Sequence, residues 1–334
     1  MKKIDQLWDE MEAEITSVRS QGTGIGRLTR WATPHEGQRL RVGVEWPSGA
    51  RVLLFSADAT ALPSRSSWPE CRGLELLLER SNSGQTALLV RLRDTRGKDV
   101  FTALAEDLAR RAVGGSEAEA ARRVLSALGR WQKFLAAKSC SLSDETRRGL
   151  WGELKVLQDL IAGVIGIEAA VSAWRGPAGA PQDFQHQGMA IEVKTRAARS
   201  PSVVRISSEQ QLHEVPWKHL FLVHIAVDEQ NGAGETLPQR ISALRSEVAT
   251  TSAAEFFEDR LLDAGWLDAE AEKHSVRGFV LREQEFFRVA DGFPRLTPPI
   301  LQQGIGGIAY DLSLDATTAF EVSIKEVKTA LTDI

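Results

Sequence analysis

Several features of secreted, zinc-binding and membrane proteins are scarce in this sequence. Its 334 residues include two cysteines, Cys71 and Cys140, which are too few for a disulfide framework or a cysteine-based zinc cluster. The N-terminus lacks the apolar run of a signal peptide. The longest apolar stretch, residues 220–227, is too short to span a bilayer and contains His224. We therefore expect a cytoplasmic globular protein that has no membrane partner.

Neither sign of charge is in large excess. A net charge of -4 does not indicate nucleic-acid binding, which usually leaves a basic footprint. The distribution of charge is more informative, because residues 105–148 hold nine Lys or Arg against six Asp or Glu, whereas residues 225–275 hold four against eleven. Any basic surface should therefore lie near the middle of the chain and not in its C-terminal part.

A strand with two different faces is predicted at residues 189–195. Small or apolar residues alternate there with polar ones, so Glu192 and Lys194 point to one face while Ile191 and Val193 point to the other. An acid and a lysine on one face are groups that can hold a divalent metal against a phosphodiester. The first face is therefore a candidate chemical site, and the second belongs to the core.

A second acid precedes this strand. Asp183 lies nine residues before Glu192, and Gly188 between them can turn the chain. A hairpin-like return would bring the two carboxylates together.

A third acid, Glu153, falls on a helix predicted at residues 146–161. At 100° per residue it lies inside the apolar stripe of that helix. An unpaired carboxylate that faces a core costs several kcal/mol, so Glu153 should find a metal, a cation or a proton. The alternative is that Glu153 lies at the edge of the stripe and reaches water.

Another polar cluster follows the strand. Residues 207–214 are predicted to form a helix that carries Gln210 and Gln211. Ser208 and Gln211 also have the spacing of a capping box, so Gln211 could serve only to close the start of the helix.

The spacing of these groups resembles the signature of the PD-(D/E)xK nuclease superfamily. The predicted order is a helix at 146–161, strands at 169–174, 182–184 and 189–195, a helix at 207–214 and a strand at 219–227. This αβββαβ order resembles the restriction-endonuclease-like core. The motifs between residues 147 and 227 are similar to the DUF4420-type family of PD-(D/E)xK proteins. One departure is that Gln182 separates Pro181 from Asp183.

The site residues and the resemblance together imply a metal-dependent nuclease. Asp183, Glu192 and the backbone carbonyl of Val193 would bind Mg²⁺, for which Mn²⁺ could substitute. Glu153 would complete the metal shell directly or through a water. The resemblance also implies a glutamine at the site on the helix after the strand, and Gln210 or Gln211 matches it. Lys194 would orient or help to deprotonate the attacking water and stabilise the charge of the transition state.

DNA is the expected partner. The candidate phosphate contacts around the site are Arg175, Arg196, Arg199, Arg205 and Lys218. By resemblance alone, the protein would act in a bacterial restriction or anti-phage defence system with methyltransferase and ATPase subunits, and a homodimer is an allowed assembly.

Two other functions are compatible with the same residues. The first is a non-catalytic DNA-binding or assembly subunit with a nuclease-like fold, although a site that has lost activity usually loses its charged residues. The second is a repair or RNA-processing nuclease, which residue types cannot separate from a restriction enzyme.

The whole chain is predicted to be α/β, or α+β overall, and to have four parts. These are an antiparallel β-rich domain at 1–97, a helical connector at 98–139, the nuclease core at 140–230 and a C-terminal α/β extension at 231–334. Outside the core, strands are expected at 40–46, 51–57, 73–80, 86–94, 276–289 and 308–314, and helices at 4–19, 99–113, 116–137, 238–250 and 253–264.

Overall fold

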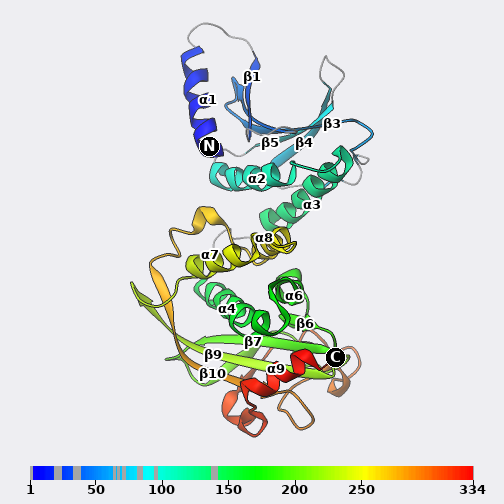
Figure 1. Cartoon of the computed structure of the whole chain (residues 1–334), viewed down its shortest axis with the longest axis vertical. Coiled ribbons are helices and arrows are strands. Elements are labelled where there is room, and N and C mark those ends of the chain that lie inside the picture. Colours follow the sequence, from blue (N-terminus) through cyan, green and yellow to red (C-terminus); the bar gives the residue numbers. More distant parts are fainter. Residues whose placement is uncertain are drawn as a thin grey trace. The chain divides into compact units, whose positions relative to one another are not determined.

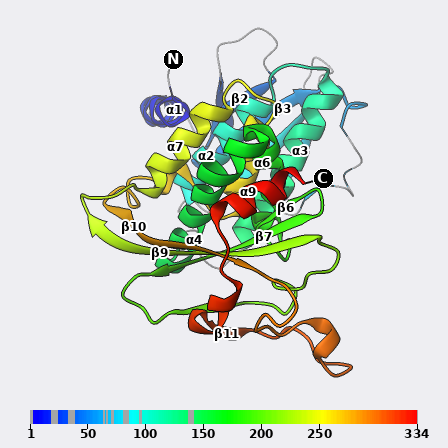
Figure 2. The same cartoon turned by 60° about the horizontal axis from the view of Figure 1, so that its bottom comes forward.

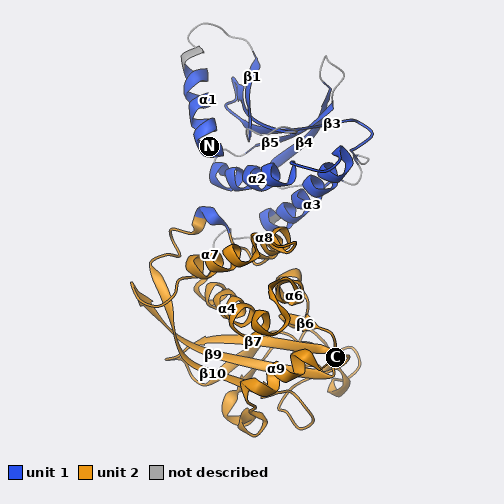
Figure 3. Ribbon diagram, in the orientation of Figure 1, with its two compact units in different colours: residues 1–140, 267–269 blue, residues 141–266, 270–334 orange. Residues whose placement is uncertain are grey.

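The chain is a mixed α/β protein with two compact units. The computed structural model describes residues 3–18, 25–32, 39–62, 65, 68–69, 73–80, 86–93, 97–136 and 142–333. Unit 1 comprises residues 1–140 and 267–269, and unit 2 comprises residues 141–266 and 270–334 (Figure 3). The division into four parts at residues 97, 139 and 230 stays a prediction. None of the described helices is long and apolar enough to cross a membrane.

Unit 1 is a five-stranded antiparallel sheet with helices on one face (Figure 1). The strand order is β1-β2-β3-β5-β4. The strands are β1 (Gly26–Trp31), β2 (Leu40–Trp46), β3 (Arg51–Ala57), β4 (Leu74–Arg80) and β5 (Thr86–Leu92). The helices are α1 (Ile4–Val18), α2 (Lys98–Arg111) and α3 (Glu117–Ala136).

Alternation along the strands assigns the two faces of this sheet. Val42, Leu53 and Val90 form a buried cross-strand row on the helix side. Trp8 of α1 stacks on Phe101 of α2, with ring centroids 5.5 Å apart. The opposite face carries Trp31, Arg41 and Leu54 in one cross-strand row, and no described helix covers it (Figure 1).

Unit 2 is built on a four-stranded mixed sheet of order β10-β9-β7-β6. Strand β6 (Phe184–His186) pairs antiparallel with β7 (Met189–Ala197), β7 pairs parallel with β9 (His219–Asn231), and β9 pairs antiparallel with β10 (Arg277–Arg288). Strands β8 (Val203–Ile206) and β11 (Tyr310–Ser313) form a separate ribbon. This ribbon and helices α4 and α6 lie on opposite sides of the sheet (Figures 1 and 2).

Helix α4 (Asp144–Lys155) is capped by Ser143, which accepts from the backbone N–H of Thr146, and continues as a π-helix over Val156–Ala162. Its buried leucines pack against Val193 and Val223 of the sheet. The other helices of unit 2 are α5 (Gly163–Ile165), α6 (Ile167–Ala173), α7 (Leu237–Val248), α8 (Ala254–Asp263) and α9 (Ile324–Thr332). Short 3₁₀ turns span Gly176–Ala178, Pro298–Ile300 and Leu314–Phe320.

Two predicted elements of the core are wrong. Residues 169–174 were expected to be a strand, but α6 spans Ile167–Ala173, because a short apolar run rich in alanine suits a helix as well as a strand. Residues 207–214 were expected to be a helix, but they are not helical, and 209–212 form turns. The strand expected at 182–184 begins later, as β6. The order of elements therefore differs from αβββαβ between β7 and β9, where the chain forms β8 and turns.

Candidate active site

Asp183 is positioned by the hairpin that joins β6 to β7. Gln187 and Gly188 form its turn with φ values of 40° and 83°, as expected of a two-residue hairpin loop. The Oδ2 atom of Asp183 accepts a hydrogen bond of 2.8 Å from the backbone N–H of Val193. The carboxylate thus takes the place of a ladder carbonyl, and it is fixed beside the strand that carries Glu192.

Gly176 makes this position of Asp183 sterically feasible. The backbone N–H groups of Arg175 and Gly176 donate to the carbonyl oxygen of Asp183. A Cβ atom at Gly176 would lie 2.5 Å from Oδ1 of Asp183 and 3.1 Å from its Cα. The close approach therefore requires glycine at this position.

Glu192 and Lys194 share one face of β7, as the alternation predicted. Glu192 is 1% exposed, and its Oε1 atom lies 2.8 Å from Nζ of Lys194. Its other oxygen, Oε2, is buried and has no hydrogen-bond partner among the described residues. A buried carboxylate oxygen that lacks a donor is costly, so it is a position where a bound cation would be stabilised.

Glu153 reaches the same place from helix α4. Trp174, which is fully buried, donates its indole N–H to Oε2 of Glu153 at 2.7 Å. The helix approaches the strand closely at the neighbouring residue, because a Cβ at Gly152 would lie only 1.9 Å from Oγ1 of Thr195. The apolar face of the helix thus does carry the carboxylate of Glu153, and the indole of Trp174 donates a hydrogen bond to it.

The pKa of each of the three carboxyl groups is raised, chiefly by burial. Burial raises the pKa of Glu192 to about 8, and the charge of Asp183 adds to this shift. Burial also raises the pKa of Asp183 to about 6, against the effects of a backbone N–H and of Lys194. Burial and then the charge of Asp183 raise the pKa of Glu153 well above its ordinary value, while the bond from Trp174 opposes the rise. The site therefore holds more negative charge than it can stabilise alone.

Lys194 is held in its charged form. Burial lowers the pKa of Lys194, but the charges of Glu192, Asp183 and Glu153 outweigh this effect, and the net shift is upward. In this environment the ammonium group can donate hydrogen bonds. A general-base role would require a neutral amine, which the surrounding carboxylates disfavour.

Gln211 lies at the site although its segment is not helical. Its Oε1 atom accepts from Nζ of Lys194 at 3.2 Å and from the backbone N–H of Ser207 at 2.7 Å. Gln182, which is 3% exposed, donates to the carbonyl oxygens of Gln210 and Gln211 at 2.8 and 3.2 Å. In the sequence, Gln182 stands out only as the residue that interrupts the Pro-Asp pair, and no pattern assigns a role to Trp174. Sequence reasoning missed both partners.

The candidate phosphate contacts fall into two groups. Arg175 and Arg199 are exposed and make no side-chain ion pair with another described residue. Arg196 is not free for a phosphate, because its guanidinium donates to His224, to Glu283 and to three backbone carbonyls. Arg205 pairs with Asp311 and Lys218 with Asp333, at 2.9 Å each, and both pairs are on the surface.

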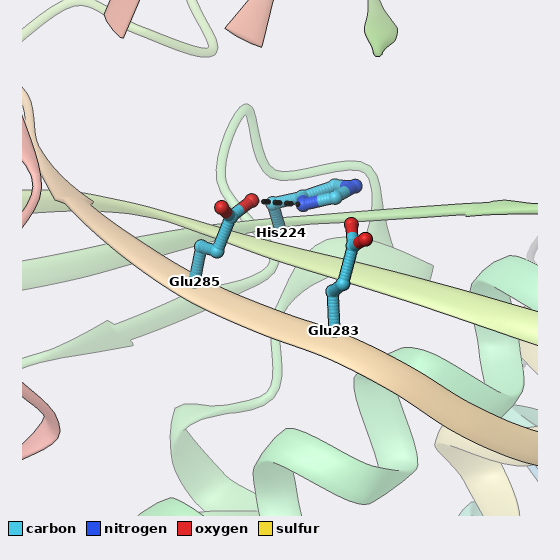
Figure 4. Close-up of side chains that lie close together, drawn as sticks. All are labelled: His224, Glu283 and Glu285. Atoms are coloured by element: carbon cyan, nitrogen blue, oxygen red, sulfur yellow. Dashed lines mark hydrogen bonds and ion pairs between the residues drawn. The ribbon is translucent and has the colours of Figure 1, made fainter. Parts of the chain in front are cut away.

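A second cluster of potential metal ligands lies on strands β9 and β10 (Figure 4). The ligand atoms of His224, Glu283 and Glu285 are within 4.8 Å of one another. Nδ1 of His224 is 2.8 Å from Glu285, while its Nε2 faces the N–H of Arg196 at 3.0 Å. Arg196 thus already supplies a cation here, and a metal would have to displace it. The sequence signals were a histidine inside an apolar strand and two acids two residues apart.

The fold and this site define a mixed α/β protein in which an acid-x-lysine strand, a preceding Asp and a helical Glu meet. The chain belongs to the family described as "Putative PD-(D/E)XK family member, (DUF4420)", whose profile matches residues 4–315. The match covers unit 1 as well as most of unit 2. No curated protein and no solved structure shows significant similarity to the chain.

Proposed function

We propose that the protein is a divalent-metal-dependent endonuclease that hydrolyses DNA phosphodiester bonds. The observation that carries the proposal is the meeting of Glu153, Asp183 and Glu192 with Lys194 in one buried site. Asp183, Glu192 and Lys194 come from one β-hairpin, whereas Glu153 comes from a helix 30 residues before Asp183. A structural ion pair would need one acid and one lysine, whereas this site has three acids. Membership of a family described as PD-(D/E)XK supports a nuclease function for the site.

The donor set suits a hard divalent cation. Carboxylate oxygens are the ligands that Mg²⁺ and Mn²⁺ prefer, and Oε2 of Glu192 is buried without a described partner. Asp183 and Glu192 would hold the ion, with Glu153 as a third carboxylate. A role for the Val193 carbonyl stays a prediction, since the contact described for Val193 at the site is its N–H bond to Asp183. A bound Mg²⁺ would neutralise phosphate charge and lower the pKa of a water.

The remaining groups have roles that follow from their contacts. Lys194, held as a cation between Glu192 and Gln211, would donate to the attacking water or to a non-bridging phosphate oxygen. Gln211 would fix the direction of that ammonium group. Trp174 would orient the Glu153 carboxylate.

The finer parts of the proposal rest on the family and on charge. Strands β6, β7 and β9 with helix α4 would form a restriction-endonuclease-like core. Arg175 and Arg199 are the candidates for contacts with the DNA backbone, because both are exposed and neither has a described ion-pair partner. A role in a restriction or anti-phage system, with methyltransferase and ATPase partners, is the context we propose for the activity.

Plasmid cleavage tests the proposal. Wild-type protein with Mg²⁺ or Mn²⁺ should nick or linearise DNA, and Lys194→Ala should lower the rate by roughly 10²- to 10⁴-fold. Lys273→Ala is the matched control, since Lys273 is exposed and pairs with Glu270, and neither residue is a candidate site residue. Neighbouring gene products should be added if the chain alone is inactive. Full activity of Lys194→Ala, or absence of cleavage with every ion and partner, would refute the proposal.

A further inference from the structure

Unit 1 contains a hollow that is lined by residues of all five strands and by Glu117 at the start of α3. The hollow has a volume of about 600 Å³, within the range of small-molecule sites. Its lining includes the short side chains of the cross-strand pair Ser56 and Ala87, at the centre of the sheet. Trp31 and Arg41 line one side, on β1 and β2, and Arg80 at the end of β4 lines the other. Small residues in the central strands between larger ones at the edges account for the depression.

The aromatic group in this hollow is not used to build the core. Trp31 is 43% exposed on the edge strand β1. The guanidinium carbon of Arg41 lies 4.1 Å from the centroid of its ring. A stacked guanidinium and indole together form a flat surface that carries positive charge, which suits a planar ring next to an anion.

The hollow is lined by both acidic and basic side chains. The arginines have fewer ion-pair partners than the acids. Neither Arg41 nor Arg80 forms an ion pair with another described residue, and both are exposed. Glu79 is balanced by Arg27, with contacts of 2.6 and 2.9 Å. Asp58 keeps an exposed carboxylate. A ligand for this hollow should therefore combine an anionic group with a flat ring that bears hydrogen-bond donors.

We propose that this hollow binds a nucleotide unit, with the base on Trp31 and the phosphate between Arg41 and Arg80. A nucleobase is planar, and most bases carry an amino group that a carboxylate such as Asp58 accepts. A phosphate supplies the anion. The same chemistry is found in a free nucleotide and in an unpaired nucleotide of a nucleic-acid strand. The hollow belongs to unit 1, so the proposal does not depend on cleavage by unit 2.

Titration calorimetry tests the binding. The full chain carrying Lys194→Ala prevents cleavage, and EDTA prevents metal-mediated binding of phosphate in unit 2. The probes are the four deoxynucleoside 5′-monophosphates, a 12-nucleotide single strand of mixed sequence and the corresponding duplex. Trp31→Ala should weaken binding by roughly tenfold or more, whereas Trp31→Phe should retain most of it. Arg80→Ala should weaken binding and reduce its dependence on salt.

Arg93→Ala is the matched control, because Arg93 follows the opposite end of β5 from the hollow and pairs with Glu75. Its binding should equal that of the parent protein. Equal affinity for monophosphate and strand identifies a free nucleotide as the ligand, and binding of the strand alone identifies single-stranded nucleic acid. The proposal is overturned if no probe binds, if the duplex binds best, or if Trp31→Ala folds normally and binds like its parent.

Discussion

Glu192 is a carboxylate whose environment differs strongly from water. It is buried beside two other carboxyl groups, one of its oxygens has no described partner, and its pKa is raised to about 8. Such a group is stabilised either by a proton or by a cation. Lys194 provides one cation, but it faces three carboxylates.

The raised pKa predicts how the stability of the metal-free protein depends on pH. Between the ordinary value of 4.5 and about 8, the folded state holds a proton on Glu192 that the unfolded chain has released. Stability should therefore fall as pH rises through this window. Glu192→Gln should flatten the dependence and be the more stable protein at pH 8. Thermal melting in EDTA from pH 5 to 8 measures this, and equal slopes for both proteins would contradict it.

Trp174 should lower the pKa of the Glu153 carboxyl group that it contacts. Its hydrogen bond favours the charged form of Glu153, so Trp174→Phe, which keeps a ring but removes the donor, should raise that pKa further. Protons would then compete better with the metal, and the pH at which Mn²⁺ binding is half-maximal should increase. Binding isotherms across pH would show it. An unchanged midpoint would mean that Glu153 lies outside the metal shell.

At the scale of elements, the contact between α4 and β7 positions Glu153. Gly152 lies so close to Thr195 that a Cβ atom at this position would overlap the threonine side chain. A Cβ at Gly149, one turn earlier on the same helix, would meet nothing within 4 Å. The two glycines therefore form a matched pair on one element.

Alanine at these positions should have opposite effects. Gly149→Ala should stabilise the protein by about 0.5–1 kcal/mol, because alanine is the better helix former. Gly152→Ala should push the helix from the strand, cost about 1–3 kcal/mol and weaken metal binding by displacing Glu153. Denaturant unfolding and Mn²⁺ titration measure the two effects. Similar stability and metal affinity for both variants would show that the contact does not position the acid.

Sequence patterns predicted some elements well for identifiable reasons. The β7 strand follows from the alternation of apolar and polar residues at 191–194, and the hairpin before it follows from a glycine in the turn. The helix predicted at residues 207–214 is wrong. The polar side chains of this segment resemble helix caps, but they make tertiary contacts instead. Gln211 contacts Lys194, and Glu209 accepts from the backbone of Gly307 and Ile308. A contact between segments about a hundred residues apart leaves no local pattern.

The candidate site was predictable only in part for the same reason. Spacing within one hairpin related Asp183 to Glu192 and Lys194, and a polar residue in an apolar stripe marked Glu153. The partner of Arg196 could not be inferred, because His224 lies on a neighbouring strand and its register with β7 is set by the fold. Trp174 was assigned to a strand, and its indole N–H gave no sequence signal.

At the scale of the whole molecule, the chain is expected to separate into independently stable parts. Limited proteolysis should cut between residues 113 and 144 and leave a stable fragment that contains the carboxylate site. A fragment that begins in this interval should bind Mn²⁺ as the full chain does. Degradation without a stable intermediate would argue against the boundary.

Metal binding by the carboxylate cluster is the central claim, and calorimetric titration with Mn²⁺ at pH 8 tests it most directly. Wild-type protein should bind the ion, and Asp183→Asn should lose at least tenfold in affinity, because it removes a ligand charge while keeping the size of the side chain. Glu283→Gln, in the second cluster with His224 and Arg196, should bind as the wild type does. Undiminished binding by Asp183→Asn, or loss of binding in Glu283→Gln alone, would contradict the assignment of the site.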